Sequence, residues 1–112
     1  MATSIAKFET LLGLFIMGTT MILREAVESL DSLDENNTIY AVKPWTGDSE
    51  VIVAPEPETG VVPAEAARLN MKYFLEVFIA RDFVNDWMAS LPTQPTLEEK
   101  CNRLVHYAVH DA

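Results

Sequence analysis

Two histidines and one cysteine near the end of the sequence have the residue types and spacing that most readily suggest chemistry. His106 and His110 are four residues apart, the spacing at which two imidazoles on one face of a helix can share a metal ion, and Cys101 precedes them. On a helix, however, both histidines lie opposite the apolar stripe that contains Cys101. The same rotation separates Cys101 from His106 as a nucleophile and its base. We therefore predict a solvated histidine face, a buried cysteine and no metal site.

Neighbouring carboxylates are the second kind of chemical candidate. Asp82 and Asp86 are four residues apart, and Glu98 and Glu99 are adjacent. General acid–base catalysis needs a cleft that shifts the pKa of such groups, whereas exposed pairs on helices mostly solvate the surface. The sequence also has no G-x-S-x-G nucleophile motif and no glycine-rich phosphate loop, because its four glycines are scattered. The residues thus favour binding over catalysis and indicate no cofactor.

Aromatic and charged residues crowd one short segment in the middle of the chain. Large aromatic side chains beside charges are typical of binding hot spots. We predict a partner-binding surface there, made by Tyr40, Lys43, Trp45, Asp48 and Glu50. The competing interpretation is that Tyr40 and Trp45 pack against a helix. In that case the next candidates for a binding face are the acidic residues Glu25, Glu28 and Asp31.

A pair of basic residues supports an alternative function. Arg68 and Lys72 are four residues apart in a segment that is predicted to be helical, and Glu76 follows on the same side. In a cleft between two copies of the chain, such cations would hold an anionic or nucleotide-like small molecule. Ordinary pairing on a helix surface explains the same pattern.

The elements that must position these residues follow from the hydrophobic periodicity. Apolar residues recur at steps of three and four over residues 4–33, which predicts one long helix whose first half is apolar almost all round. Residues 38–45 and 50–54 alternate and are rich in β-formers, so they predict a hairpin. Helical periodicity returns over residues 63–91, and Thr96 with Glu99 forms a capping box for a third helix that reaches His110.

These elements predict an α+β fold that is predominantly helical, with a long N-terminal helix, a β-hairpin and then two helices in the order α-β-β-α-α. The chain has 112 residues, of which 49% are hydrophobic, so we expect a single domain spanning residues 1–112. Two helices with apolar residues on opposite faces are hard to cover within one small monomer, although a compact monomer is the alternative if the hairpin covers one face of the second helix and the third helix covers another. We therefore predict a homodimer, with Leu14, Met17 and Met21 at its interface.

Charge and cysteine content restrict the partners and the compartment. Seventeen acidic residues against eight basic ones give a net charge of -9, which opposes direct binding to nucleic acid. The uncharged run over residues 10–23 is shorter than the roughly 20 residues that span a bilayer, and the residues around it do not fit a signal peptide, so we expect no membrane segment. A single cysteine excludes an internal disulfide and favours a cytoplasmic location.

Together these observations favour a small acidic protein-binding module. Inhibitors, immunity or anti-defence factors and adaptors commonly have this size and charge, so a protein partner is the expectation. The alternative is a homodimeric protein that binds a small anionic or nucleotide-like ligand.

Overall fold

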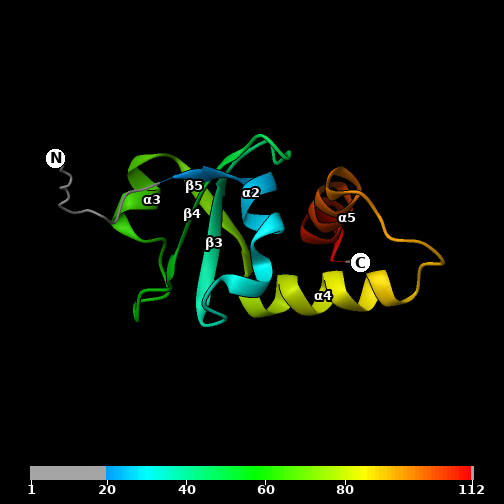
Figure 1. The fold of residues 1–112 in the computed structure, drawn as a ribbon. Coiled ribbons are helices and arrows are strands. Elements are labelled where there is room, and N and C mark those ends of the chain that lie inside the picture. Colours follow the sequence, from blue (N-terminus) through cyan, green and yellow to red (C-terminus); the bar gives the residue numbers. More distant parts are fainter. Residues whose placement is uncertain (1–19, 112) are drawn as a thin grey trace, which may run out of the picture.

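The computed structural model describes residues 20–111 and shows an α+β fold (Figure 1). The elements follow in the order β2 (Met21–Ile22), α2 (Leu23–Glu28), the 3-10 helix η1 (Leu30–Ser32), β3 (Asn37–Val42), β4 (Glu50–Pro55), α3 (Ala64–Arg68), β5 (Met71–Glu76), α4 (Val77–Ala89) and α5 (Leu97–His110). The α+β class agrees with the prediction. The predicted order α-β-β-α-α is wrong, because two strands lie where the sequence pattern predicts helix.

The long N-terminal helix is corrected in the part of it that the structure describes. Met21 and Ile22 form an antiparallel edge strand on β4, opposite Val51 and Glu50, and the helix begins only at Leu23. Pairing with β4 outweighs the local preference of these residues for a helix. The side chain of Glu25 then accepts a hydrogen bond from the Ile22 N–H at 3.0 Å, which fixes the start of α2. The remainder of the prediction, with Leu14 and Met17, lies outside the described residues.

The predicted second helix over residues 63–91 is also wrong. It consists of the short helix α3, the strand β5 and the helix α4. Asn70 has a φ of 60°, a left-handed conformation that ends the first helix and that asparagine tolerates better than most residues. The two apolar faces that suggest one helix therefore belong to an edge strand, in which Met71, Phe74 and Leu75 are buried, and to a separate amphipathic helix. This removes the contribution of that segment to the argument for a dimer.

The predicted hairpin is confirmed and forms the centre of the sheet. β3 and β4 pair antiparallel from Asn37 opposite Pro55 to Ala41 opposite Val51, within a four-stranded antiparallel sheet of order β2-β4-β3-β5. Side chains of β3 alternate between two buried layers, because both faces of the sheet are covered. Ile39 contributes to the larger core and Tyr40 to the smaller one.

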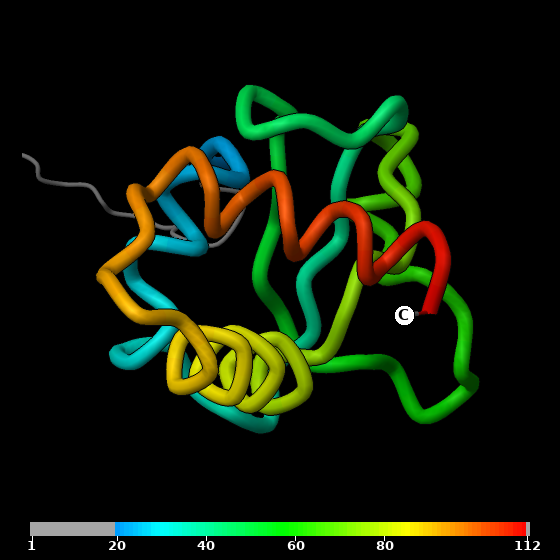
Figure 2. The backbone as a smooth tube through the Cα atoms, turned by 90° about the vertical axis from the view of Figure 1, so that its right-hand side faces the viewer, coloured from blue at the N-terminus to red at the C-terminus, as the bar shows by residue number. Residues whose placement is uncertain are grey.

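Helices cover the two faces of the sheet unequally. The larger core lies between the sheet and the helices α2, α4 and α5, and the smaller core lies beneath α3. Figure 2 shows α5 lying across the first of these faces, with α4 seen nearly end-on below it. Within residues 20–111, none of the helices has both the length and the apolar character needed to cross a lipid bilayer.

The predicted third helix is confirmed together with its capping box. The Glu99 N–H donates to Thr96 Oγ1 at 3.1 Å, and the Thr96 N–H donates to Glu99 Oε1 at 2.7 Å. Cys101 and Leu104 on the inner side of α5 are fully buried. Local signals suffice for this helix, because its cap and its apolar stripe agree.

Candidate functional site

The aromatic residues of the predicted binding surface take part in the core. Tyr40 is 1% exposed and packs in the smaller core, which corrects its assignment to a partner-binding surface. Burial raises the pKa of its phenol, and its hydroxyl has no hydrogen-bond partner among the described residues. Trp45 is half-buried, with its ring edge-on to Phe74 at a centroid distance of 4.9 Å and its indole N–H donating to the Ala41 carbonyl at 3.3 Å. The aromatic residues of the hairpin thus stabilise the core, which their sequence pattern alone does not show.

The other members of the predicted surface are exposed on the hairpin. The Lys43 ammonium lies 4.8 Å from the centroid of the Trp45 ring, where a cation–π attraction holds it. Lys43, Pro44 and Trp45 line an open hollow of about 390 Å³ together with Ala108 and Val109 from the end of α5. Glu50 is exposed at the start of β4.

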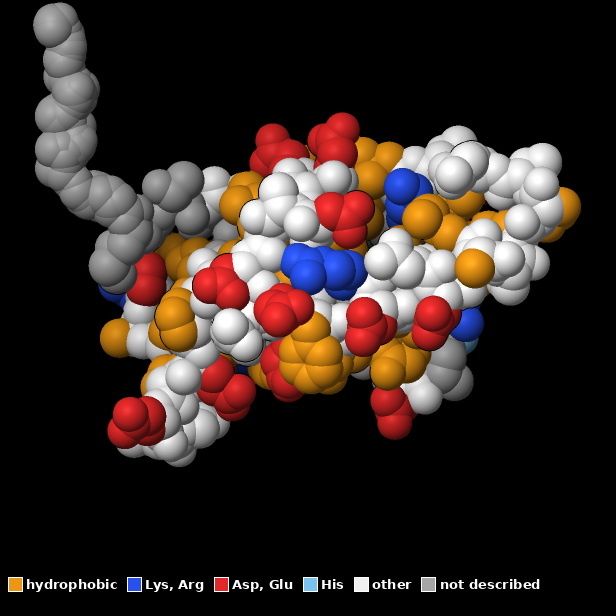
Figure 3. Space-filling view, turned by 60° about the horizontal axis from the view of Figure 1, so that its bottom comes forward, with side chains coloured by type: hydrophobic (Ala, Val, Ile, Leu, Met, Phe, Trp, Pro, Cys, Tyr) orange, Lys and Arg blue, Asp and Glu red, His pale blue; other side chains and the backbone are white. Residues whose placement is uncertain are grey.

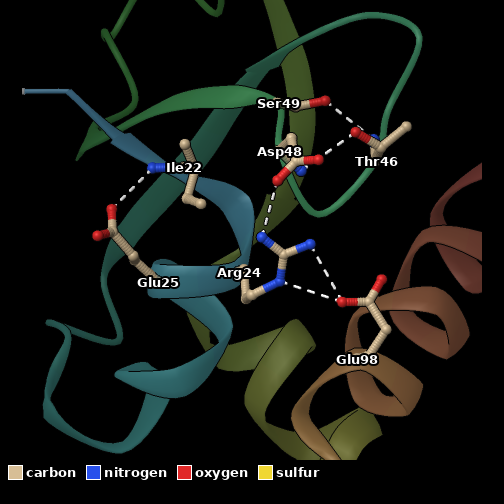
Figure 4. Close-up of polar contacts among 7 residues, drawn as sticks. All are labelled: Ile22, Arg24, Glu25, Thr46, Asp48, Ser49 and Glu98. Carbon is tan, nitrogen blue, oxygen red and sulfur yellow. Dashed lines mark hydrogen bonds and ion pairs between the residues drawn. The ribbon is translucent and has the colours of Figure 1, made fainter.

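Asp48 serves to hold the hairpin loop in place. The Arg24 guanidinium of α2 bonds to Asp48 Oδ1 at 2.8 Å and to Glu98 of α5 at 3.1 Å, so that three segments meet at one cation (Figure 4). The hydrogen bond to Asp48 and the one to Glu98 raise the pKa of Arg24. Gly47 leaves space for this guanidinium, because a Cβ there would lie 2.7 Å from Arg24 Nη2.

The predicted basic pair is not on one helix. Arg68 is at the end of α3 and forms an ion pair with Glu65 of the same helix, whereas Lys72 is exposed in the strand β5. The helical spacing on which the ligand interpretation rests is therefore absent.

The histidines and the cysteine lie on opposite sides of α5, as the sequence predicts. Cys101 is fully buried, and burial raises the pKa of its thiol, which disfavours the reactive thiolate. His106 and His110 are exposed, with ring centroids 4.5 Å apart. Within residues 20–111, no group of three or more histidine, cysteine, aspartate or glutamate side chains is placed to hold a metal ion.

Acidic side chains gather instead around the contact between α4 and η1. Arg81 of α4 forms this contact, because its guanidinium donates to the Leu30 carbonyl at 2.8 and 3.1 Å and to the Leu33 carbonyl at 2.6 Å. Its remaining nitrogen, Nη1, lies 3.5 Å from a carboxylate oxygen of Glu35. The charge of Arg81 is thus directed at the backbone of η1 and at Glu35.

An exposed aromatic ring lies beside this contact. Phe78 is 46% exposed, and it lines a hollow of about 200 Å³ with Glu35, Arg81 and Asp82. Glu28 and Asp31 line a second, smaller hollow on the other side of Arg81. We call this surface the acidic face; it comprises Phe78 and the exposed residues Glu28, Asp31, Asp34, Glu35, Asp82 and Asp86. Figure 3 shows this side of the molecule, with acidic side chains around an exposed hydrophobic surface and a few basic side chains among them.

The sequence predicts part of the acidic face but not its centre. Charge alone makes Glu28 and Asp31 candidates, but Phe78 has the periodicity of a core residue. Because β5 ends at Glu76, the helix that carries Phe78 begins later than the periodicity predicts, and the ring points away from the core. The signal that marks it is the placement of Asp82 one turn after Phe78, which makes that side of α4 polar.

Comparison with known proteins finds no relative of this chain: no family model, no curated protein and no solved structure matches it. The geometry of the described residues therefore carries the functional inference.

Proposed function

We propose that this protein is a small protein-binding module whose acidic face docks onto a basic surface of a partner protein, in the manner of an inhibitor, an immunity or anti-defence factor, or an adaptor. The observation that carries the proposal is the exposed ring of Phe78 among carboxylates. Aromatic anchors of this kind contribute most of the affinity of protein interfaces, and the charges around them select and steer the partner.

The helix that carries the ring is rigidly held. Val77, Ala80 and Val84 on the inner side of α4 are at most 5% exposed, and Arg81 fixes the helix to η1. A surface that is ordered before binding loses little conformational entropy when a partner arrives. The exposed ring of Phe78 is therefore available to a partner at small entropic cost.

The charge of the acidic face defines the chemistry of the partner. The basic residues at this surface are Arg81, which is directed at η1, and Lys100, which lines the smaller hollow. The partner must therefore supply lysine or arginine side chains around an apolar depression that accepts Phe78. The net charge of -9 also favours a basic partner, because it raises the rate of encounter with a positively charged protein.

The test compares capture by the wild-type chain with capture by two variants. We expect a protein from the source organism to be retained by the wild type and lost with Phe78→Ala, while Val109→Ala, which shortens an exposed side chain on α5, retains it. With that protein purified, Phe78→Ala should weaken binding by at least about tenfold, which is about 1.4 kcal/mol. Calorimetry measures this difference.

Charge reversal supplies the second arm of the same test. Asp82→Lys with Asp86→Lys should slow association and flatten its dependence on salt, because long-range attraction between charges is screened. Equal affinity of the wild type, Phe78→Ala and the charge-reversed variant would refute the proposal. Loss of binding with the Val109→Ala control alone would move the site to the hollow at the hairpin.

We also propose, from the sequence pattern, that the chain forms a homodimer and resides in the cytoplasm. The apolar residues on both sides of the first half of the predicted N-terminal helix support the dimer, and the buried, unpaired Cys101 is compatible with a reducing compartment. Met21 is half-buried against the larger core, so its substitution would affect the fold as well as an interface.

Met17→Glu is therefore the appropriate variant for the dimer. A charge placed without a partner in an apolar interface typically costs several kcal/mol, so we expect this variant to be monomeric at micromolar concentration. Light scattering measures the mass in solution. A wild-type chain that is already monomeric under the same conditions would disprove the dimer.

A further inference from the structure

A pocket of about 510 Å³ lies between the end of α4, the segment 90–96 and the outer side of α5. Figure 1 shows that this segment extends beyond the end of α4 before the chain turns back into α5. The volume is within the range of about 300–1,000 Å³ that is typical of small-molecule sites. This pocket is separate from the acidic face, and no residue is shared between the two.

One end of the pocket is apolar. Trp87 lines it from the last turn of α4, and Leu91, Pro92 and Pro95 line it from the connecting segment. Trp87 is half-buried, so part of its indole remains accessible. Flat apolar walls of this kind bind aromatic rings, because stacked or edge-on contacts add to the gain from burial.

The other end of the pocket is polar and carries positive charge. Arg103 and His106 are three residues apart on α5 and both line the pocket. The Arg103 guanidinium lies 4.8 Å from the ring centroid of Phe83, and Arg103 Nη1 is 3.5 Å from His106 Nδ1. Phe83 is itself stacked on Tyr107, with centroids 4.2 Å apart. These contacts hold the guanidinium in a defined orientation, and guanidinium groups match carboxylates in geometry.

A carboxylate on α5 fixes the direction in which a ligand would lie. Glu99 lines the pocket near the connecting segment, and its Oε1 accepts the capping hydrogen bond from the Thr96 N–H. Glu99 and His106 are seven residues apart, which is about 10 Å along a helix. An anionic group is repelled from the Glu99 end and attracted to the Arg103 end.

We infer that this pocket binds a small aromatic carboxylate. The ring of the ligand lies against Trp87 and the prolines, and its carboxylate accepts hydrogen bonds from Arg103, with His106 beside it. The inference is independent of the proposed function, since the acidic face repels anions and takes a macromolecular partner.

The test uses benzoate and phenylacetate as probes, with benzamide as the neutral counterpart. The chain has two tryptophans, so its two indole N–H signals in a nitrogen-15 NMR spectrum report the two sites separately. We expect the carboxylates to shift the Trp87 signal with saturation, to leave the Trp45 signal unchanged, and to bind at least about tenfold more tightly than benzamide. This comparison needs no variant and therefore does not depend on folding of a mutant.

Substitution of the cation supplies the second measurement. Arg103→Gln should remove the preference for benzoate over benzamide, whereas Arg68→Gln, the same change at an exposed arginine of α3, should keep it. Three results would each overturn the inference: equal affinity for benzoate and benzamide, a response at Trp45 in place of Trp87, or no saturable binding of either carboxylate. None of these results bears on capture of a protein partner by the acidic face.

Discussion

Replacing Trp45 with alanine is expected to lower the free energy of unfolding by about 3 kcal/mol, near the lower end of the range for buried aromatic residues. The ring is half-buried and packs edge-on against Phe74, which is itself 2% exposed in the larger core. Alanine would remove this contact and leave the Ala41 carbonyl without its indole donor. Urea unfolding followed by circular dichroism measures the change.

A matched control on the same loop separates packing from charge. Lys43→Gln removes the ammonium group over the Trp45 ring, but Lys43 is exposed and cation–π pairs at such sites contribute only about 0.5–1 kcal/mol. We therefore expect this variant to unfold close to the wild type. If Trp45→Ala is as stable as Lys43→Gln, the tryptophan has no structural role and the hairpin regains its place as the binding surface.

The sequence predicts the elements whose signals are local. The hairpin is confirmed because alternation in both strands and turn residues between them agree, and α5 is confirmed because Thr96 and Glu99 cap it. In each case the pattern within a few residues coincides with the pairing or packing in the fold.

The segments that fail are those in which tertiary contacts decide between helix and strand. Residues 71–76 are apolar at spacings that fit a helix, but β5 pairs with β3, and its buried residues Met71, Phe74 and Leu75 do not alternate regularly with its exposed ones. A strand without a clean alternation of buried and exposed residues cannot be separated from a helix by periodicity alone. Likewise, Met21 and Ile22 pair with a strand about 30 residues away in the sequence, which no local pattern reveals.

In the candidate site, too, local sequence signals identify some residues, whereas others depend on tertiary contacts. Residue types identify Trp45 as notable, but only its contact with Phe74 shows that it supports the core. Charge alone predicts an acidic face, whereas the exposure of Phe78 within it depends on where α4 begins. The pocket beside Trp87 requires the return of α5 across the end of α4, and its polar residues are ordinary surface residues in the sequence.

Arg81→Met is expected to lower the free energy of unfolding by about 2–3 kcal/mol, since hydrogen bonds from a charged group contribute about 1.5–3 kcal/mol. Methionine keeps an apolar stem against α4 but removes the guanidinium that donates to the carbonyls of Leu30 and Leu33. The side chain is only 21% exposed, so water replaces these donors poorly. The pair with Glu35 at 3.5 Å adds little, because Glu35 is 64% exposed.

The control is the same substitution at an exposed arginine. Arg68→Met removes an ion pair with Glu65 within one short helix, and surface changes of this kind usually shift stability by less than about 0.5 kcal/mol. Urea unfolding of the two variants gives the comparison, and similar losses in both would show that Arg81 does not anchor η1. Arg81→Lys should lie between methionine and the wild type, because an ammonium group keeps the charge but cannot reach both carbonyls with a planar fork.

The Arg81 variant also links the stability of the fold to the acidic face. Asp31 lies in η1 and Glu35 follows it, so both depend on the segment that Arg81 holds against α4. Hydrogen exchange in Arg81→Met should accelerate at the amides of residues 30–33 before it does so in the central strands. Arg81→Met removes a positive charge from an acidic site, so charge alone would make binding to a basic partner tighter. If the acidic face must be ordered to bind, the variant should instead bind more weakly. Tighter binding would show that charge, and not order, limits the affinity.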